Sequence, residues 1–369
     1  MPPSTNDAPT RARVVRVVVL GDLLLDVVLA PHRPLVPGTD VAGRVSLRQG
    51  GSAATTARWL ARLGARSTLI TSVGRDPAGR ALLGEVREDS VTVRAIRPPG
   101  QRTGRIGVIL GAGGERSFVA DRGAADALAA ADLRAAWFSR ADLLHLPFYS
   151  LIGPALGGAG RRAAELTRVA DGLLSVDLAS SVPLLADGRR AALARLREVR
   201  PDILFATLAE VQTLLGAGPL ERLLSLAPVA VVKRGSKGAT VLARGPINAP
   251  GSPEPTGLAD ASGVSGTPAV SGVSGTPAVS GAPGVPGGAD DARSPILGAR
   301  LRFEVATRPI DAVDTTGAGD AFDAGFLVTW LRARAAGVSL SMALQRSALA
   351  GHQAAARQLT APRTELALG

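Results

Sequence analysis

Short apolar runs alternate with longer amphipathic segments along most of the chain. The first run, residues 14–20, is rich in β-branched valine and stops at Gly21, a pattern typical of a buried strand in a parallel sheet. Five later runs repeat this signal, at residues 69–73, 143–146, 173–176, 203–205 and 229–232. Segments with helical periodicity lie between the runs, among them residues 52–63, 189–199 and 208–215. This alternation predicts βαβ units and a parallel sheet covered by helices on both faces.

Two segments depart from this alternation, at residues 31–49 and 102–121. Both contain short apolar stretches interrupted by turn residues, and the second includes the hairpin signal Gly111-Ala112-Gly113-Gly114. We expect short antiparallel strands in both segments. Together they would form a small separate sheet that acts as a lid.

Composition sets two further segments apart from the predicted domain. Residues 1–13 are a polar tail, which we expect to be disordered. Residues 248–295 consist largely of Gly, Pro, Ser, Ala and Thr, and residues 262–270 are repeated without change as residues 271–279. Such a composition cannot bury enough apolar surface to offset its ordering entropy. We therefore expect a disordered insertion within one domain that spans residues 14–365, with a binding tail as the alternative.

The charge and the cysteine content exclude several classes of protein. None of the 369 residues is cysteine, so disulfides, thiolate metal sites and cysteine nucleophiles are ruled out. The formal net charge is +11, but only Lys233 and Lys237 are lysines, and the arginines are scattered along the chain. Specific binding to nucleic acid needs a focused basic patch. We therefore expect no specific nucleic-acid partner.

The most apolar stretch near the N-terminus, residues 14–30, contains Arg16, Asp22 and Asp26. These charges interrupt it well short of the roughly 20 apolar residues that a membrane span needs. The two aspartates also disrupt the apolar core that a signal peptide requires. We expect a cytoplasmic protein with no membrane partner.

The strongest chemical signal is the sequence Asp-Thr-Thr-Gly-Ala-Gly-Asp-Ala-Phe at residues 314–322, followed by an apolar helical run at residues 325–331. Small residues at a helix start leave the amides of the first turn unshielded, and the helix dipole favours an anion there. Asp320 lies in the same turn, where its carboxylate can take a proton from a hydroxyl beside a bound phosphate. The alternative is a Gly-rich loop in which Asp320 is an ordinary helix cap.

Two weaker signals lie nearer the N-terminus. Gly50 and Gly51 precede a predicted helix, where a ligand can approach the backbone closely, and Thr55 offers a hydroxyl one turn later. Asp26 lies in an apolar run at the carboxyl end of the first predicted strand, where parallel sheets bind their ligands. A buried carboxylate needs partners, and sugar hydroxyls are suitable ones. The alternatives are a plain turn at the glycines and a solvent-facing aspartate.

These residues make the chain resemble the ribokinase family of carbohydrate kinases, also called PfkB. Residues 50–64 match its N-terminal signature and residues 314–322 its C-terminal one. Further landmarks follow in family order, at residues 73–79, 103–104, 123–125, 202–216 and 235–238. The resemblance extends from about residue 14 to about residue 359, apart from the low-complexity insertion. It implies a Rossmann-like, doubly wound, mostly parallel sheet with a small β lid, and a kinase that uses ATP and Mg²⁺.

The resemblance also implies roles for residues at the reacting centre and at the sugar. Asp320 is the general base, and the backbone amides of Gly317, Ala318 and Gly319 form an anion hole. The residues implied to hold the sugar are Asp26, Gly50, Gly51 and Thr55.

Other roles implied by the resemblance concern the nucleotide and the cations. Glu210 organises water around Mg²⁺, or else is an exposed helix glutamate. Asp314 belongs with Thr316 to a loop that holds a monovalent cation such as K⁺. The residues implied at the nucleotide are Gly235, Ser236, Gly238, Thr316 and His352, the last of which is otherwise a satisfied helix histidine. A homodimer through the lid is a further expectation.

The sequence departs from the family pattern at several of these positions. Thr55 replaces an asparagine, and Thr207 replaces the asparagine of an Asn-x-x-Glu motif, so each side chain loses an amide. Leu24 replaces the polar residue of ribose-specific members, and residues 359–362 lack the usual C-terminal turn. The sequence thus predicts ATP-dependent phosphorylation of a sugar or sugar-like hydroxyl other than ribose. The alternatives are a nucleoside kinase and a catalytically silent ligand-binding member.

Overall fold

The computed structural model describes residues 13–111, 116–245, 300–312, 314–362 and 364–368. Residues 1–244 and 300–369 belong to one structural unit, to which the following description applies. The predicted tail up to residue 12, the tip of the predicted hairpin at residues 112–115 and the low-complexity segment 248–295 lie outside the described residues.

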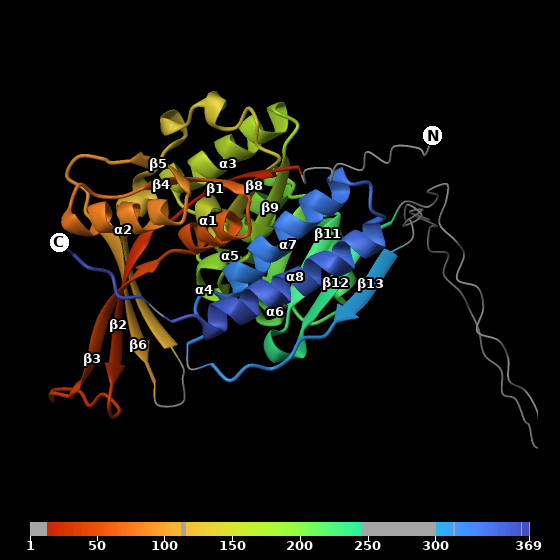
Figure 1. Cartoon of the computed structure of the whole chain (residues 1–369). Helices are drawn as coiled ribbons and strands as arrows, with labels where there is room; N and C mark the ends of the chain where they lie inside the picture. Colours follow the sequence, from red (N-terminus) through yellow and green to blue (C-terminus); the bar gives the residue numbers. More distant parts are fainter. Residues whose placement is uncertain (1–12, 112–115, 246–299, 313, 363, 369) are drawn as a thin grey trace, which may run out of the picture. The chain divides into compact units, whose positions relative to one another are not determined.

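A sheet of nine strands forms the centre of the unit (Figure 1). Its order is β13-β12-β11-β10-β9-β8-β1-β4-β5, with every pair from β11 to β5 parallel and the pairs β11–β12 and β12–β13 antiparallel. This is the predicted α/β class with a mostly parallel sheet. The strand bounds are β1 Arg16–Leu20, β4 Arg66–Ser72, β5 Thr92–Ile96, β8 Leu143–Pro147, β9 Leu173–Asp177, β10 Ile203–Thr207, β11 Val229–Lys233, β12 Ala239–Arg244 and β13 Arg300–Val305.

Helices cover both faces of this sheet because successive strand residues point to opposite sides. Val17 and Val19 of β1 belong to a core with α1, α2, α7 and α8. Val18 and Leu20 belong to a second core with α3, α5 and α6. The helix bounds are α1 Ser52–Arg62, α2 Pro77–Glu88, α3 Pro154–Val169, α4 Ser181–Leu184, α5 Gly188–Val199, α6 Leu208–Leu215, α7 Ala318–Ala335 and α8 Leu340–Thr360.

Short 3₁₀ turns connect several of these elements. Their bounds are Ala124–Ala127, Ala130–Asp132, Ala135–Trp137, Phe148–Leu151, Leu220–Ser225 and Gly235–Lys237.

Among the helices of the described ranges, none combines the length and the apolar character that crossing a bilayer demands.

A second sheet of four strands, which we call the lid sheet, has the order β3-β2-β6-β7. Figure 1 shows β2, β3 and β6 extending away from the nine-stranded sheet. The pairs β2–β3 and β6–β7 are antiparallel, as expected, but β2 and β6 run parallel, so the expectation of an all-antiparallel sheet is wrong. The strand bounds are β2 Leu24–Pro31, β3 Gly43–Gly50, β6 Thr103–Leu110 and β7 Arg116–Gly123.

The lid sheet also begins earlier in the chain than the sequence indicated. Asp26, expected at the carboxyl end of the first strand, lies instead in β2 of the lid sheet. The chain changes sheets at Gly21, where a Cβ atom would come within 2.7 Å of the Ser150 hydroxyl and 2.8 Å of the Ala53 Cβ. The apolar residues on both sides of this glycine form one continuous run in the sequence, which conceals the boundary between the two sheets.

Candidate active site

A cavity of about 1390 Å³ opens at the carboxyl ends of the parallel strands and reaches the lid sheet. This volume exceeds the roughly 300–1,000 Å³ of a pocket for one small molecule, so two ligands have room side by side. Every site residue predicted from the sequence lines this cavity. They are Asp26, Gly50, Gly51, Thr55, Glu210, Gly235, Ser236, Gly238, Asp314, Thr316, Gly317, Ala318, Gly319, Asp320 and His352.

The start of α7 provides a cluster of backbone donors on one wall of this cavity. Gly317 precedes the helix with φ 75°, a left-handed conformation that glycine adopts readily. A Cβ atom at this position would also come within 2.9 Å of the Gln358 amide nitrogen and 3.0 Å of the Thr55 methyl. The first amides of a helix have no partner within it and attract anions. The Ala318 amide lies 3.3 Å from the Thr315 carbonyl oxygen, a long contact.

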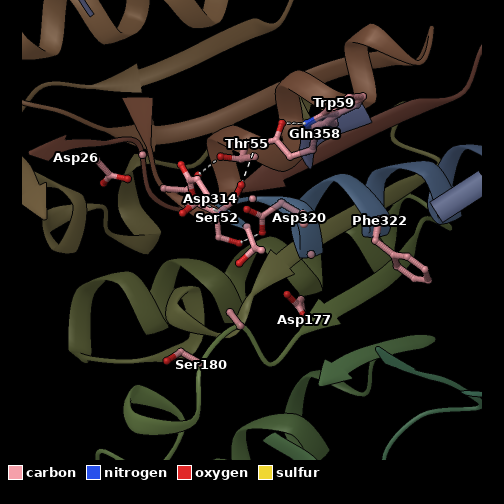
Figure 2. A pocket seen from close by; sticks show the side chains of 18 of the residues that line it. Asp26, Ser52, Thr55, Trp59, Asp177, Ser180, Asp314, Asp320, Phe322 and Gln358 are labelled. Carbon is pink, nitrogen blue, oxygen red and sulfur yellow. Dashed lines mark hydrogen bonds between the residues drawn. The ribbon is translucent and has the colours of Figure 1, made fainter. Parts of the chain in front are cut away.

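Asp320 is the third residue of α7, lines the cavity and points toward Ser52 at the start of α1 (Figure 2). The Ser52 hydroxyl donates a hydrogen bond to its Oδ1. Burial raises the pKa of Asp320 to about 7, with further upward contributions from Asp177 and Asp22 and opposing ones from Ser52 and Lys233. A carboxyl with a pKa near neutrality is suited to accept a proton at physiological pH.

A buried ion cluster lies directly behind the start of α7. The Lys233 ammonium at the end of β11 lies 3.0 Å from Asp177 and 3.1 Å from Asp323. It also lies 3.4 Å from the place where a Gly319 Cβ would be, so its charge is adjacent to the predicted anion hole. Burial alone disfavours the ammonium, but Asp177 and Asp323 outweigh this effect and raise the pKa of Lys233.

No role was predicted for these three residues, although the sequence contains a signal for each. Asp177 and Lys233 are the polar residues that end two apolar strands, and ligands of parallel sheets bind at strand ends. Asp323 interrupts the apolar run of α7 and is fully buried. Ser52, which contacts Asp320, carries no comparable signal because serine is common at helix starts.

Glu210 forms a reciprocal cap with Thr207 at the start of α6. Its Oε2 accepts the Thr207 amide at 2.8 Å, and the Glu210 amide donates to the Thr207 hydroxyl at 3.3 Å. The side chain is buried, so the alternative of an exposed helix glutamate is wrong. Burial, followed by the charge of Asp177, raises its pKa. Threonine at position 207 thus has a structural function, which is to hold the glutamate at the cavity wall.

Asp26 lies on the lid side of the cavity, opposite α7 in Figure 2. Burial raises its pKa to about 7, with Asp22 and Asp314 adding to the shift and Arg48 opposing it. Gly50 is required beside it, because a Cβ atom at this position would lie 2.0 Å from an Asp26 carboxylate oxygen. The carboxylate therefore packs directly on the backbone that precedes α1.

Thr55 and Gly51 are linked in the first turn of α1. The Thr55 hydroxyl donates to the Gly51 carbonyl at 3.0 Å, so its hydrogen serves the helix and only its oxygen remains as an acceptor. Gly51 has φ 97°, and a Cβ there would lie 2.5 Å from the Asp22 carbonyl oxygen. Asp22 is itself buried and pairs with Arg122 of the lid sheet at 3.1 Å.

The turn between β11 and β12 and helix α8 form the remaining wall. Gly238 has φ 86°, and a Cβ there would lie 2.1 Å from the Val305 carbonyl oxygen. His352 contacts this same oxygen through Nε2 at 3.3 Å and packs edge-on against Phe322 at 5.0 Å. The histidine therefore has partners within the chain and still borders the cavity.

The fold is that of ribokinase-like proteins in solved structures. Adenosine kinase from Sinorhizobium meliloti superposes with a TM-score of 0.69 at 20% identity, covering 96% of this chain and 98% of its own. A putative ribokinase II from E. coli, in complex with ATP and Mg²⁺, gives a TM-score of 0.66 at 20% identity over 95% of this chain and 94% of its own.

The chain belongs to the pfkB family of carbohydrate kinases, whose model matches residues 15–255 and 298–367. Fructokinase-1 of Oryza sativa subsp. japonica is 34% identical over 166 residues, which is 44% of this chain and 50% of that protein. Fructokinase-2 of Solanum habrochaites is 29% identical over 212 residues, which is 56% of this chain and 63% of that protein. The chain thus matches about half the length of these curated relatives.

Proposed function

We propose that this protein transfers the γ-phosphoryl group of ATP to a hydroxyl of a sugar, with Asp320 as the general base. The observation that carries the proposal is the position of Asp320 in the first turn of α7, beside unshielded helix amides. Burial raises its pKa to about 7, which suits a base at this place. Membership of the pfkB family supports the same reaction. Ser52 keeps the carboxylate oriented by donating to Oδ1.

The proposed reaction is an in-line displacement at phosphorus. The substrate hydroxyl gives its proton to Asp320 as its oxygen bonds to the γ-phosphorus, and the bond to the β–γ bridging oxygen breaks to release ADP. The amides of Gly317, Ala318 and Gly319 stabilise the negative charge on the transferring group. Lys233 places an ammonium group adjacent to Gly319, and Asp177 and Asp323 balance its charge.

The two ends of the cavity receive the two substrates in this proposal. Asp26 accepts hydrogen bonds from adjacent sugar hydroxyls, while Gly50 and Gly51 let the sugar approach the backbone. Thr55 contributes one acceptor there, because its hydrogen is engaged by Gly51. The residues assigned to the nucleotide are Gly235, Ser236, Gly238, Thr316 and His352.

The carboxylates at the cavity wall fit a Mg²⁺ ion that binds together with ATP. No group of three or more His, Asp or Glu side chains within the described part of the chain is arranged to hold a metal ion alone. Mg²⁺ commonly binds through one or two carboxylates together with substrate phosphates and water, and Glu210 and Asp177 line the cavity. The ion would neutralise phosphate charge, and Glu210 would orient the water around it.

Fructose is the first substrate to test, because the fructokinases are relatives at 29–34% identity. The experiment measures ADP release from Mg-ATP with a panel of sugars and nucleosides, using fructose, glucose, ribose and adenosine. Turnover of a sugar supports the proposal. Turnover of adenosine alone would replace it with the nucleoside kinase alternative, and no turnover with intact ATP binding would indicate a silent member.

We also propose that two copies associate through the lid sheet. Its two outer strands expose apolar side chains, with Val45 of β3 at 62% and Val119 of β7 at 67% of full exposure. Large exposed apolar side chains often mark an interface, and these two lie on the opposite edge strands of the same four-stranded sheet. Light scattering during gel filtration tests this, and Val45→Asp with Val119→Asp should yield a monomer.

A further inference from the structure

Two arginines of the lid sheet contact the loop that precedes the predicted anion hole. The lid sheet has β3 and β7 as its edge strands. Arg48 extends from β3 and Arg116 is the first residue of β7. Their targets are consecutive residues of one loop, Asp314, Thr315 and Thr316, which we call the phosphate loop. Strands far apart in the sequence therefore converge on a segment next to the reacting centre.

The carboxylate of Asp314 faces both guanidinium groups. Its Oδ2 accepts a hydrogen bond from Arg48 Nη1 at 3.0 Å, and its Oδ1 lies 3.6 Å from Arg116 Nη1. Oδ1 also accepts the Thr316 amide at 2.9 Å. The three charged side chains are only 22–27% exposed, so solvent screens these contacts incompletely.

The neighbouring oxygens of the phosphate loop also accept hydrogen bonds from donors of the chain. Arg116 donates to the hydroxyls of Thr316 and Thr315, the latter at 2.7 Å. The Thr316 carbonyl accepts Gln358 Nε2 at 3.0 Å. Gln358 is fixed in turn by the Trp59 indole, which donates to its Oε1 at 2.9 Å, as Figure 2 shows. Helices α1 and α8 thus also hold the loop, through Trp59 and Gln358.

This donor set does not fit the monovalent cation that the resemblance implied at Asp314 and Thr316. A bound K⁺ needs oxygen atoms directed at it and no positive charge beside it. Here guanidinium groups and an amide nitrogen are directed at the Asp314 carboxylate and the Thr316 carbonyl instead. A K⁺ ion next to Asp314 would lie beside two fixed positive charges, and the repulsion between like charges is substantial where solvent is partly excluded.

We propose that Arg48, Arg116 and Gln358 hold the phosphate loop in the position that a monovalent cation would otherwise stabilise, so that this protein works without K⁺. The inference rests on the proposed phosphoryl transfer. The three side chains are positioning residues, since they act on the reaction through the phosphate loop, which directly precedes Gly317 and the start of α7. Because Arg48 and Arg116 come from the lid sheet, they also tie the anion hole to the sheet that carries Asp26.

The first test measures initial rates with the Tris salt of ATP, MgCl₂ and the accepted sugar at constant ionic strength. Potassium, sodium, rubidium and choline chlorides are compared. We expect kcat values within about twofold of each other, since no step needs a small cation. Activation of about tenfold or more by potassium over choline would overturn the inference while leaving the phosphoryl transfer itself intact.

The second test asks whether the arginines take the place of the cation. Arg116→Gln and Arg48→Gln should lower kcat at unchanged KM for the sugar, and added guanidinium or K⁺ should restore part of the loss. The matched control is Arg44→Gln on β3, an exposed arginine of the same strand. Equal kcat values in all three variants would contradict the proposal. Far-ultraviolet circular dichroism verifies that each variant folds.

A third measurement is independent of turnover. Hydrogen exchange of the amides in residues 314–319 should be the same in potassium and choline for the unaltered chain, and about threefold or more faster in Arg116→Gln. Protection of this loop by K⁺ in the unaltered chain would overturn the inference. If no substrate is phosphorylated, the proposed function fails, and this exchange experiment still decides how the loop is held.

Discussion

The two sides of the cavity are built in different ways. On the α7 side, the ion cluster consists of Lys233 and Asp177 at strand ends and Asp323 in the second turn of α7, with side chains between 0% and 11% exposed. On the lid side, Arg48 and Arg116 extend from the edges of a four-stranded sheet and remain about one-quarter exposed. The α7 side is therefore fixed by burial, whereas the lid side depends on long side chains that span two sheets.

This difference suggests a division of tasks. A phosphoryl group needs donors that do not move during the reaction, and backbone amides backed by a buried ammonium meet that need. A sugar has to enter and leave, and longer side chains at a partly exposed edge allow that. We therefore expect substitutions on the α7 side to affect turnover and stability most, and substitutions at the sugar-facing residues of the lid side, such as Asp26, to affect substrate affinity and choice. Arg48 and Arg116 are the exception on the lid side, because they contact the phosphate loop and so act on turnover.

The largest effect is expected for the proposed base. Asp320→Asn should lower kcat by about 10²- to 10⁴-fold, because an amide cannot accept the proton of the hydroxyl. ATP binding should persist, since the anion hole consists of backbone amides. Steady-state kinetics and calorimetric titration of ATP test both points. Glu88→Gln, an equivalent change at an exposed residue of α2, is the control. Wild-type turnover in Asp320→Asn would remove this residue from the mechanism.

The buried ammonium is expected to determine stability. Lys233→Met leaves Asp177 and Asp323 without their counter-charge and should lower the free energy of unfolding by about 3–5 kcal/mol. Urea unfolding measures this. The control is Lys237→Met at the exposed lysine four residues later, for which a change within about 0.5 kcal/mol is expected. Adding Asp323→Leu to Lys233→Met should recover part of the loss, and a further decrease in the double variant would contradict this account.

On the lid side, Asp26→Ala should raise KM for the sugar roughly tenfold or more. Loss of a hydrogen bond to a charged group typically costs about 1.5–3 kcal/mol. KM for ATP should stay nearly constant, because Asp26 lies on the lid side, away from the proposed nucleotide wall. Asp26→Asn keeps the packing against Gly50 and separates the loss of charge from the loss of volume. An unchanged KM in both variants would mean that the sugar binds elsewhere.

The raised pKa of Asp320 predicts a specific pH dependence. With a pKa of about 7, the basic form increases about tenfold between pH 6 and pH 8, and kcat/KM should rise accordingly. Asp26 also has a pKa of about 7, so the profile of Asp26→Asn is needed to assign the inflection. If the inflection disappears in Asp26→Asn, the group that titrates is Asp26 and not Asp320.

Stability should change with pH in the opposite direction. Between pH 3.8 and about 7 the folded protein binds more protons at Asp320 than the unfolded chain does, so its contribution to stability decreases as the pH rises. Asp320→Asn should therefore raise Tm more at pH 8 than at pH 5. Thermal unfolding at both pH values measures the difference, and equal changes in Tm would contradict the assigned pKa.

The smallest effect is expected at Thr55. Thr55→Asn replaces the methyl group beside Gly317 and the hydroxyl bonded to Gly51 with an amide. The ratio of kcat/KM values between fructose and ribose should shift by about 2- to 10-fold, which corresponds to one hydrogen bond gained or lost. The control is Thr92→Asn at the exposed start of β5. The neighbouring Thr56 is unsuitable as a control because it is buried. Identical ratios would exclude Thr55 from sugar choice.

The sequence predicted the strands of the main sheet and the start of α7 better than the lid sheet and the charged pairs of the cavity. Local periodicity predicted the strands of the main sheet, and the small residues at 314–322 predicted the helix start. Such local patterns can be recognised in the sequence before the fold is known. The pairs Arg48–Asp314 and Lys233–Asp323 join residues that are 266 and 90 positions apart. No local pattern encodes such pairs, because they arise only when separate elements pack.

Asp26 shows a second reason for the limit. Asp26 lines the cavity as expected, but it belongs to the lid sheet and not to the first strand of the main sheet. One apolar run of the sequence contains both β1 and the start of β2. Periodicity records which positions are buried, not against which neighbours they are buried. The change of sheet depends on the close packing of Gly21 against Ser150. The Ser150 hydroxyl also donates to the carbonyl of Leu20, which lies 130 positions earlier in the sequence.

The contact between Ser52 and Asp320 joins residues separated by 268 positions. A ribosome adds about 5–20 residues per second, so Ser52 emerges roughly 13 to 54 s before its partner. During that interval α1 already covers β1 and β4, but the side of α1 that packs against α7 in the folded protein has no partner. A nascent chain of this protein therefore exposes apolar surface until its last segment is made, and chaperone binding at that stage would protect it from aggregation.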